Sequence, residues 1–121
     1  MRIVIPSETD QLLDAPRSGH FGHAPWMTVV ELDETGQVTS MEAVKNVEHG
    51  EGGCGNVIMH VMDLKADAII TAGMGMPPLM RFTQAGIVVY ADRSVLTVGE
   101  VLALFVAGQV AQMSPDDACR H

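Results

Sequence analysis

The sequence is short of three things that would assign its class at once: cysteines, basic residues and long apolar runs. Its two cysteines, Cys54 and Cys119, lie far apart in a chain without an export signal. Free thiols or metal ligands are therefore expected rather than a structural disulfide. No apolar run approaches the roughly 20 residues of a membrane-spanning helix, and the first residues turn polar too soon for a signal peptide. We expect a cytoplasmic protein with no membrane segment.

Positive charge is scarce. Seven Lys and Arg residues stand against fifteen Asp and Glu residues, which gives a formal net charge of -8 at pH 7. Because binding to nucleic-acid phosphates draws on a basic face, this balance argues against nucleic acid as the main partner. An anionic ligand would need a local site built from backbone N–H groups, histidines or a few well-placed arginines.

The chain also lacks the motifs of common metal-dependent and nucleotide-dependent enzymes. It has no CxxC, no HExxH and no Walker lysine, and Gly73-x-Gly75 is not the full dinucleotide fingerprint. A two-metal nuclease needs converging carboxylates, typically including one in the first strand, and residues 2–6 carry none. A nucleophilic pair of Cys54 with a histidine can be written, but a loop cysteine near a histidine is common. We expect the protein not to be an enzyme.

Hydrophobic spacing predicts five strands and three helices. The strands are expected at residues 2–6, 26–32, 37–47, 68–72 and 87–91. The helices are expected at residues 56–65, 77–85 and 97–106. Local signals support these limits: a hairpin turn at residues 33–36, Asn56 as an N-cap, Gly86 as a helix stop, and Thr97 with Glu100 as a capping box.

The order of these elements predicts an α/β fold. The first three strands should form an antiparallel meander, and the alternation of strands and helices that follows implies parallel pairing. Together they predict a five-stranded mixed sheet with helices on both faces, which is a three-layer α/β/α domain over residues 1–108. Residues 109–121 are polar and are expected to form a flexible tail.

Three loops are expected to meet where a ligand would bind. In open α/β sheets, ligands collect outside the carboxyl ends of parallel strands. That edge should receive residues 17–23 after the first strand, residues 73–75 after the fourth and residues 92–94 after the fifth. Glycines allow a close backbone approach, and the helix after residue 75 is expected to offer unpaired N–H groups and its positive dipole end. The edge therefore predicts an anion site.

Several side chains near these loops have both a metal-binding interpretation and a plain one. His20 and His23 flank Phe21, and a loop histidine is most often just solvated. An aromatic anchor at Phe21 would, however, pin the loop to the core and leave a histidine facing the cleft. Cys54 lies in a glycine-rich loop and is a candidate soft ligand. The methionines are either core filler or thioether ligands for Cu(I), and the candidates closest in sequence are Met74, Met76 and Met80.

Four stretches carry a family resemblance: RIVIP at residues 2–6, HFGHAP at 20–25, AIITAGMG at 68–75 and AGIVV at 85–89. In this order they resemble the nitrogenase iron–molybdenum cofactor-binding family. That family includes carriers and accessory factors of dinitrogenase cofactor assembly, and small stand-alone proteins of anaerobes and archaea. The resemblance covers about residues 1–108, and HFG is its most specific motif. It implies a ribonuclease-H-like fold with a five-stranded mixed sheet.

The resemblance also implies which residues contact a cofactor. The histidine of the HFG motif is implicated in holding the cluster, so that role would fall on His20, with Phe21 and Gly22 as its motif neighbours. His23 stands where relatives often have another residue, and Cys54 is a candidate from its chemistry alone. The candidate cofactor-binding residues are Arg17, His20, Phe21, Gly22, His23, Gly53, Cys54, Gly73, Met74, Gly75 and Arg93, with His20 and Cys54 as candidate metal ligands.

The sequence is most similar to a stand-alone kind of member from sulfate-reducing bacteria, which holds a molybdenum–copper sulfide cluster without covalent attachment. The resemblance implies such a cluster here, or an iron–molybdenum–sulfur cluster as the alternative. Because the sulfides fill the metal coordination, the protein needs a pocket with N–H donors, an arginine and apolar walls rather than many ligands. We predict a noncovalent cluster carrier that exchanges with a donor or acceptor protein. The alternative is a non-catalytic interaction module in an assembly or division complex.

Overall fold

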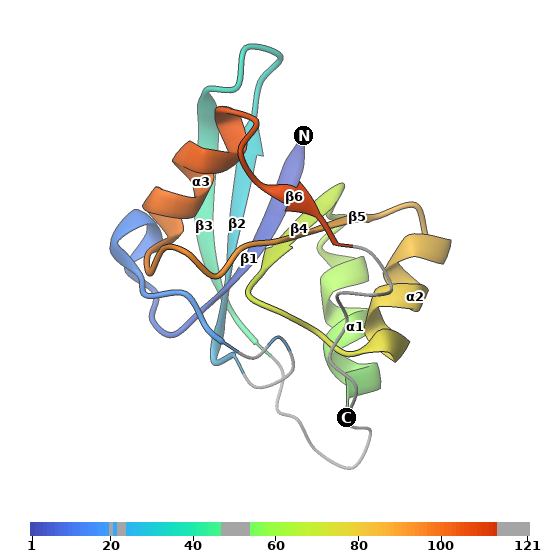
Figure 1. The fold of residues 1–121 in the computed structure, drawn as a ribbon. Coiled ribbons are helices and arrows are strands. Elements are labelled where there is room, and N and C mark those ends of the chain that lie inside the picture. Colours follow the sequence, from blue (N-terminus) through green and yellow to red (C-terminus); the bar gives the residue numbers. More distant parts are fainter. Residues whose placement is uncertain (20, 22–23, 47–53, 114–121) are drawn as a thin grey trace.

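The computed structural model of the chain describes residues 1–19, 21, 24–46 and 54–113, with the backbone alone for residues 54–57. Within these residues six strands form one mixed sheet in the order β3-β2-β1-β4-β5-β6 (Figure 1). The strands are β1 (Arg2–Ser7), β2 (Trp26–Leu32), β3 (Val38–Lys45), β4 (Ala68–Thr71), β5 (Val88–Ala91) and β6 (Ala111–Gln112). The helices are α1 (Cys54–Asp63), α2 (Met76–Gln84), α3 (Val98–Val106) and the short 3-10 helix η1 (Leu12–Asp14).

The pairing of the strands follows the predicted pattern. β1, β2 and β3 pair antiparallel, and β1, β4 and β5 run parallel. In the β2–β3 turn, Asp33 Oδ1 accepts hydrogen bonds from the N–H groups of Thr35 (2.9 Å) and Gln37 (3.0 Å). Gly36 has φ 85°, a conformation that glycine adopts without steric cost. The predicted meander and hairpin turn are confirmed.

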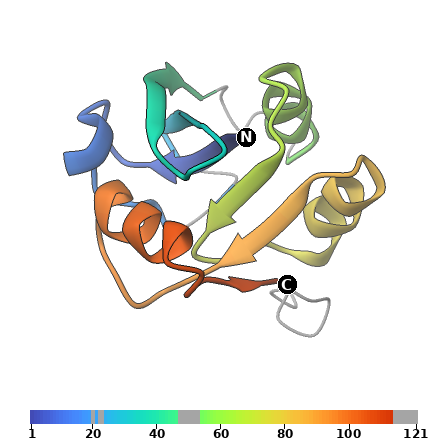
Figure 2. The same ribbon diagram turned by 90° about the horizontal axis from the view of Figure 1, so that it is seen from above.

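Helices cover both faces of the sheet, as Figure 2 shows from above. Alternate residues of a strand point to opposite faces, so each strand contributes to two cores. Val4 of β1 belongs to the core that contains Phe82 of α2 and residues of α1. Ile5 belongs to the core that contains Val101 of α3. The prediction of helices on both faces is confirmed, whereas the ribonuclease-H-like topology stays a prediction.

The sheet has six strands where the sequence predicts five. β6 pairs antiparallel with β5, with Gln112 opposite Tyr90 and Ala111 opposite Ala91. Two exposed residues show no alternation of apolar and polar side chains, so no sequence pattern marks this strand. It forms because the edge of β5 offers unpaired backbone groups. β6 lies within the predicted tail, and residues 114–121 lie outside the described residues.

The helix ends follow the predicted signals in two of the three helices. Gly86 follows α2 with φ 83°, and Thr97 Oγ1 accepts the N–H of Glu100 at the start of α3 (3.2 Å). α1 instead begins at Cys54, so Asn56 lies inside the helix and its prediction as the N-cap is wrong. A longer run of backbone hydrogen bonds outweighs one cap preference. None of these helices is long and apolar enough to cross a membrane, a search confined to the described residues.

Candidate functional site

The carboxyl ends of β1, β4 and β5 meet at one edge of the sheet, where backbone hydrogen bonds join the loops that follow them. The N–H of Arg17, in the loop after β1, donates to Leu96 O in the loop after β5 (2.7 Å). The N–H of Asp92 donates to Thr71 O at the end of β4 (3.0 Å). The described parts of the three loops that the sequence assigns to a ligand edge therefore lie together.

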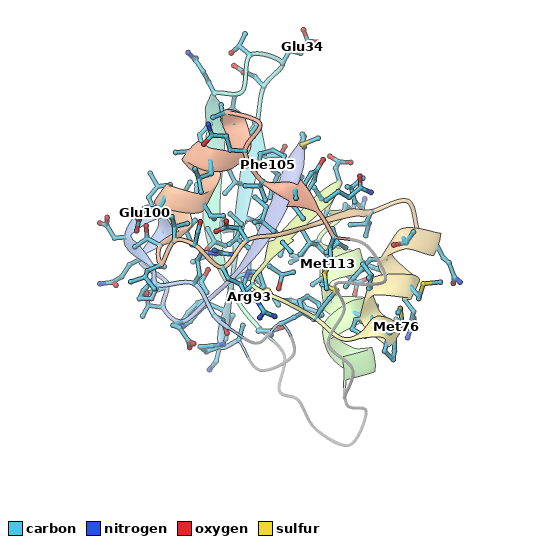
Figure 3. All side chains as sticks on the ribbon, viewed as in Figure 1. Glu34, Met76, Arg93, Glu100, Phe105 and Met113 are labelled. Carbon is cyan, nitrogen blue, oxygen red and sulfur yellow. The ribbon has the colours of Figure 1, made fainter. Side chains whose placement is uncertain are left out.

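A cleft of about 360 Å³ opens at this edge, beside β6. Arg93 and Met113, both labelled in Figure 3, are among its walls. The lining residues are Ala72, Gly73, Ala91, Asp92, Arg93, Ala111, Gln112 and Met113. Gly73 and Arg93 belong to the predicted set. The sequence placed Asp92 at the ligand edge but did not name it, Ala72 or Ala91 as binding residues. It missed residues 111–113 because it did not predict β6.

Arg93 is exposed, yet its guanidinium group is held in place. Its Nε donates a hydrogen bond to Ala72 O in the loop after β4 (2.6 Å). Its Nη1 and Nη2 donate to no group in the part of the chain that the structure describes. A guanidinium group is permanently charged, and its planar fork binds anions through paired N–H groups. Arg93 is therefore suited to contact an anion in the cleft.

Arg17 has a different environment from the one that the sequence suggested. Its side chain is only 4% exposed and is not part of the cleft wall. Nη1 lies 3.2 Å from Asp92 Oδ2 and Nη2 donates to Asp92 O (2.8 Å), while Nη1 also donates to Val95 O (3.2 Å). Burial lowers the pKa of the guanidinium group, although the charge of Asp92 raises it. The side chain of Arg17 thus joins the loop after β1 to the loop after β5.

The carboxylate of Asp92 has several donors. Ser94 donates to it through its N–H (3.0 Å) and its hydroxyl (2.8 Å). Burial raises the pKa of Asp92, but the hydrogen bonds from Ser94 and the charge of Arg17 outweigh burial, so the net shift is downward. Asp92 therefore carries a full negative charge at neutral pH.

Phe21 is the residue of the HFG motif that lies within the described chain. It is 3% exposed, and its ring packs edge-on against Phe82 of α2, with 5.4 Å between ring centroids and an interplanar angle of 87°. The predicted anchoring of this loop to the core is confirmed. His20, Gly22 and His23 lie outside the described residues, and so do Gly53 and the side chain of Cys54.

The start of α2 offers fewer N–H donors than expected. Gly75 is its N-cap residue, and Pro77 and Pro78 in its first turn have no N–H. The N–H of Leu79 donates to Gly75 O (3.2 Å). Of the first four residues of α2, only Met76 has an N–H that the helix does not use. The expectation of several free donors here is wrong, because proline suits the first helical turn yet removes the donors.

The turn between β4 and α2 is held by hydrogen bonds between Thr71 and Gly73, and the next residue, Met74, is buried. The N–H of Gly73 donates to Thr71 Oγ1 (3.2 Å), and this hydroxyl donates to Gly73 O (3.0 Å). The side chain of Met74 is buried in the core on the α1–α2 face, as the core-filler interpretation expects. Met76 and Met80 are 39% and 40% exposed, so they lie at the surface of α2 instead.

The described residues contain no group of three or more His, Cys, Asp or Glu side chains that could hold a metal ion. A larger hollow of about 690 Å³ lies away from the loops after β4 and β5. Its walls are Met1, Leu32, Asp33, Glu34, Thr35, Gly36, Phe105 and Val106. The positive group in these walls is the N-terminal ammonium of Met1, which donates to Leu32 O (2.9 Å), and the carboxylates of Asp33 and Glu34 outweigh it, so the smaller cleft suits an anion better.

Residues 1–108 match the dinitrogenase iron-molybdenum cofactor family. The chain belongs to this family. No curated protein matches the chain. The family comparison confirms the resemblance carried by the motifs around Phe21 and Gly73. The site residues themselves are not tested by this match, since it assigns the whole segment rather than single positions.

Solved structures show the same fold. The apo form of the orange protein from Desulfovibrio gigas has a TM-score of 0.78 and 25% identity, covering 93% of this chain and 92% of that chain. A proposed dinitrogenase from Methanocaldococcus jannaschii has a TM-score of 0.74 and 20% identity, covering 94% and 95%. A proposed NifB protein from Thermotoga has a TM-score of 0.76 and 21% identity, covering 92% and 91%. The last two likenesses concern the fold alone.

Proposed function

We propose that this protein binds an anionic metal–sulfur cluster noncovalently in the cleft beside Arg93 and acts as its carrier. The observation that carries the proposal is the exposed guanidinium group of Arg93, held by Ala72 O at the edge where the loops converge. The similarity to the orange protein and the membership of a family named for the iron-molybdenum cofactor support it.

The residues of the cleft fit a cluster better than a bare metal ion. A metal–sulfur cluster brings its own sulfide ligands, so it needs charge balance, hydrogen-bond donors and soft or apolar contacts. Arg93 and the amide of Gln112 are the side-chain donors of the cleft. The apolar part of its wall is formed by Ala72, Ala91, Ala111 and Met113.

The proposal also assigns roles to the predicted residues of the neighbouring loops. Phe21 anchors the loop after β1 to the core. We assign His20, the histidine of the HFG motif, as a ligand of the cluster. Cys54 is proposed as a second ligand, and Gly22, His23 and Gly53 are proposed as further contact residues of the cluster; these assignments come from the sequence, since all of them lie outside the residues or side chains that the structure describes. The cargo is a molybdenum–copper sulfide cluster, or an iron–molybdenum–sulfur cluster as the alternative. The protein catalyses no reaction and exchanges its cargo with a cytoplasmic donor or acceptor protein.

The test is to mix metal-free protein with tetrathiomolybdate and Cu(II), desalt it and record the visible spectrum. We expect charge-transfer bands to remain with the wild-type protein. Arg93→Ala should weaken retention about tenfold or more, because charge-assisted hydrogen bonds are among the stronger ones. Arg81→Ala is the matched control, since Arg81 is an exposed arginine on α2 outside the cleft.

Two outcomes would contradict the proposal. Wild-type protein that loses all bands on desalting does not carry such a cluster. An equal loss in Arg93→Ala and Arg81→Ala would show that the anion follows overall charge rather than the cleft. Copurification of one protein partner with no metal would favour the interaction module instead.

A further inference from the structure

The cleft proposed to receive an anion also contains a carboxylate. Asp92 lines it next to Arg93, and the side chain of Asp92 is 14% exposed. Like charges within a Debye length of about 10 Å repel, and they do so more strongly where protein excludes water. An anion in this cleft therefore requires that the charge of Asp92 be compensated.

Arg17 provides the compensating charge from behind the cleft wall. Its guanidinium group lies 3.2 Å from Asp92 Oδ2 and is 4% exposed, so it faces the carboxylate and not the open cleft. The hydrogen bond from Nη2 to Asp92 O (2.8 Å) fixes the backbone immediately before Arg93. Among the described residues, this is the one ion pair that Asp92 makes.

The charges around the cleft then sum simply. Arg17 and Asp92 cancel, and the exposed Arg93 leaves the cleft with one net positive charge. With a neutral residue in place of Arg17, Asp92 would cancel Arg93 instead. The cleft would then have no net charge, although every residue that lines it would be the same.

We propose that Arg17 is a specificity-determining residue that never touches the cargo: by neutralising Asp92 it makes the cleft selective for anions. This inference rests on the proposed function, because it explains how that site accepts its cargo. Arg17 is accordingly a positioning residue and Arg93 the contact residue. A purely structural clamp between the two loops would show the same hydrogen bonds but would not depend on the charge of Asp92.

The experiment compares the affinity of wild-type protein, Arg17→Gln, Asp92→Asn and the double variant for tetrathiomolybdate. Arg17→Gln should lower the affinity about tenfold at low salt, and the loss should shrink as salt screens the charges. Asp92→Asn alone should raise the affinity, because Arg17 then adds its unbalanced charge. The double variant should recover to within about threefold of wild type, since both charges of the pair are gone.

The rescue separates charge from structure. If the double variant binds as weakly as Arg17→Gln, Arg17 is only a clamp and the inference is wrong. Thermal unfolding verifies that each variant folds; if Arg17→Gln does not fold, Asp92→Asn alone decides by raising the affinity or leaving it unchanged. If wild-type protein binds no tetrathiomolybdate, the proposed function fails. The affinities of the same variants are then measured with molybdate as the probe, from the shift of the Arg93 N–H signal in NMR spectra. If the variants do not follow the expected order of affinity for molybdate, the inference is wrong.

Discussion

Phe21 and Arg93 contribute to the candidate site in different ways, one through packing and the other through charge. Phe21 has no polar atom to offer a ligand, and its ring is buried against Phe82 on α2. Arg93 has little apolar contact to offer, and its Nε is fixed by a backbone carbonyl group. The loop after β1 is thus held at Phe21 by burial, and the loop after β5 is held at Arg93 by a hydrogen bond. Both interactions fix loops at the edge of the sheet where the parallel strands end.

Phe21→Ala should destabilise the protein by about 3 kcal/mol, because it removes a buried aromatic side chain and leaves a cavity. Phe21→Leu is the control: it keeps most of the buried volume and loses mainly the edge-to-face contact with Phe82, worth about 1 kcal/mol. Denaturant unfolding measures both. A loss below about 1 kcal/mol for Phe21→Ala would show that this loop is not anchored through its ring.

At the scale of single residues, the sequence identifies chemical types but not their partners. It singles out Arg17 and Arg93 equally, because both are arginines in loops at the expected edge. Only the fold separates them, since Asp92 lies 75 positions from Arg17 in the chain. The anchoring role of Phe21 was predictable, because an aromatic residue between small and polar neighbours has few other uses in such a loop.

At the scale of elements, α3 is joined by backbone contacts to the loop that carries Arg17. Its N-terminus lies at the ligand edge, where Val98 N–H donates to Ala15 O (3.0 Å) and Thr97 forms a bridge with Pro16. Residue 17 follows this bridge at once, so the start of α3 supports the backbone that carries Arg17. The hydroxyl of Thr97 also donates to the side chain of Glu100 (2.9 Å).

Thr97→Ala should lower the free energy of unfolding by about 1 kcal/mol, because the N–H of Glu100 loses its cap. Thr97→Ser keeps the hydroxyl and should leave the free energy of unfolding close to that of wild type, because serine is at least as good an N-cap residue as threonine. Chemical denaturation followed by circular dichroism compares the three proteins. Equal stability of Thr97→Ala and wild type would show that the bridge with Pro16, and not the cap, holds this end of α3.

The elements that the sequence predicts are those with a recognisable hydrophobic pattern or a helix-capping signal. β1, β2, β4 and β5 are apolar runs, and α3 has both an amphipathic face and a capping box. η1 and β6 have neither. Leu12 in η1 has φ 60°, a left-handed conformation that its residue type does not favour. Both elements depend on tertiary contacts, so the sequence did not predict them. Because β6 was not predicted, its part of the cleft wall was not predicted either.

On the scale of the whole molecule, a chain with a net charge of -8 is proposed to carry an anion. The negative net charge does not exclude an anion from the cleft, because the charge at the cleft is set locally by Arg17, Asp92 and Arg93. At an ionic strength near 0.15 M, charges beyond about 8 Å are largely screened, so distant carboxylates matter little. The sequence predicted the ligand edge because parallel strands place their carboxyl ends together.

The measurement that tests the central claim most directly is the metal and acid-labile sulfide content of freshly purified protein, together with its visible spectrum. The protein should be made in medium containing molybdate and sulfide. The account predicts that the protein contains molybdenum with sulfide and either copper or iron, and that it shows charge-transfer bands. These bands should be lost from the protein fraction when the protein is denatured and desalted, because the cluster is held noncovalently. Protein that contains neither metal nor sulfide, or that keeps its metal through denaturation, would contradict a noncovalent cluster carrier.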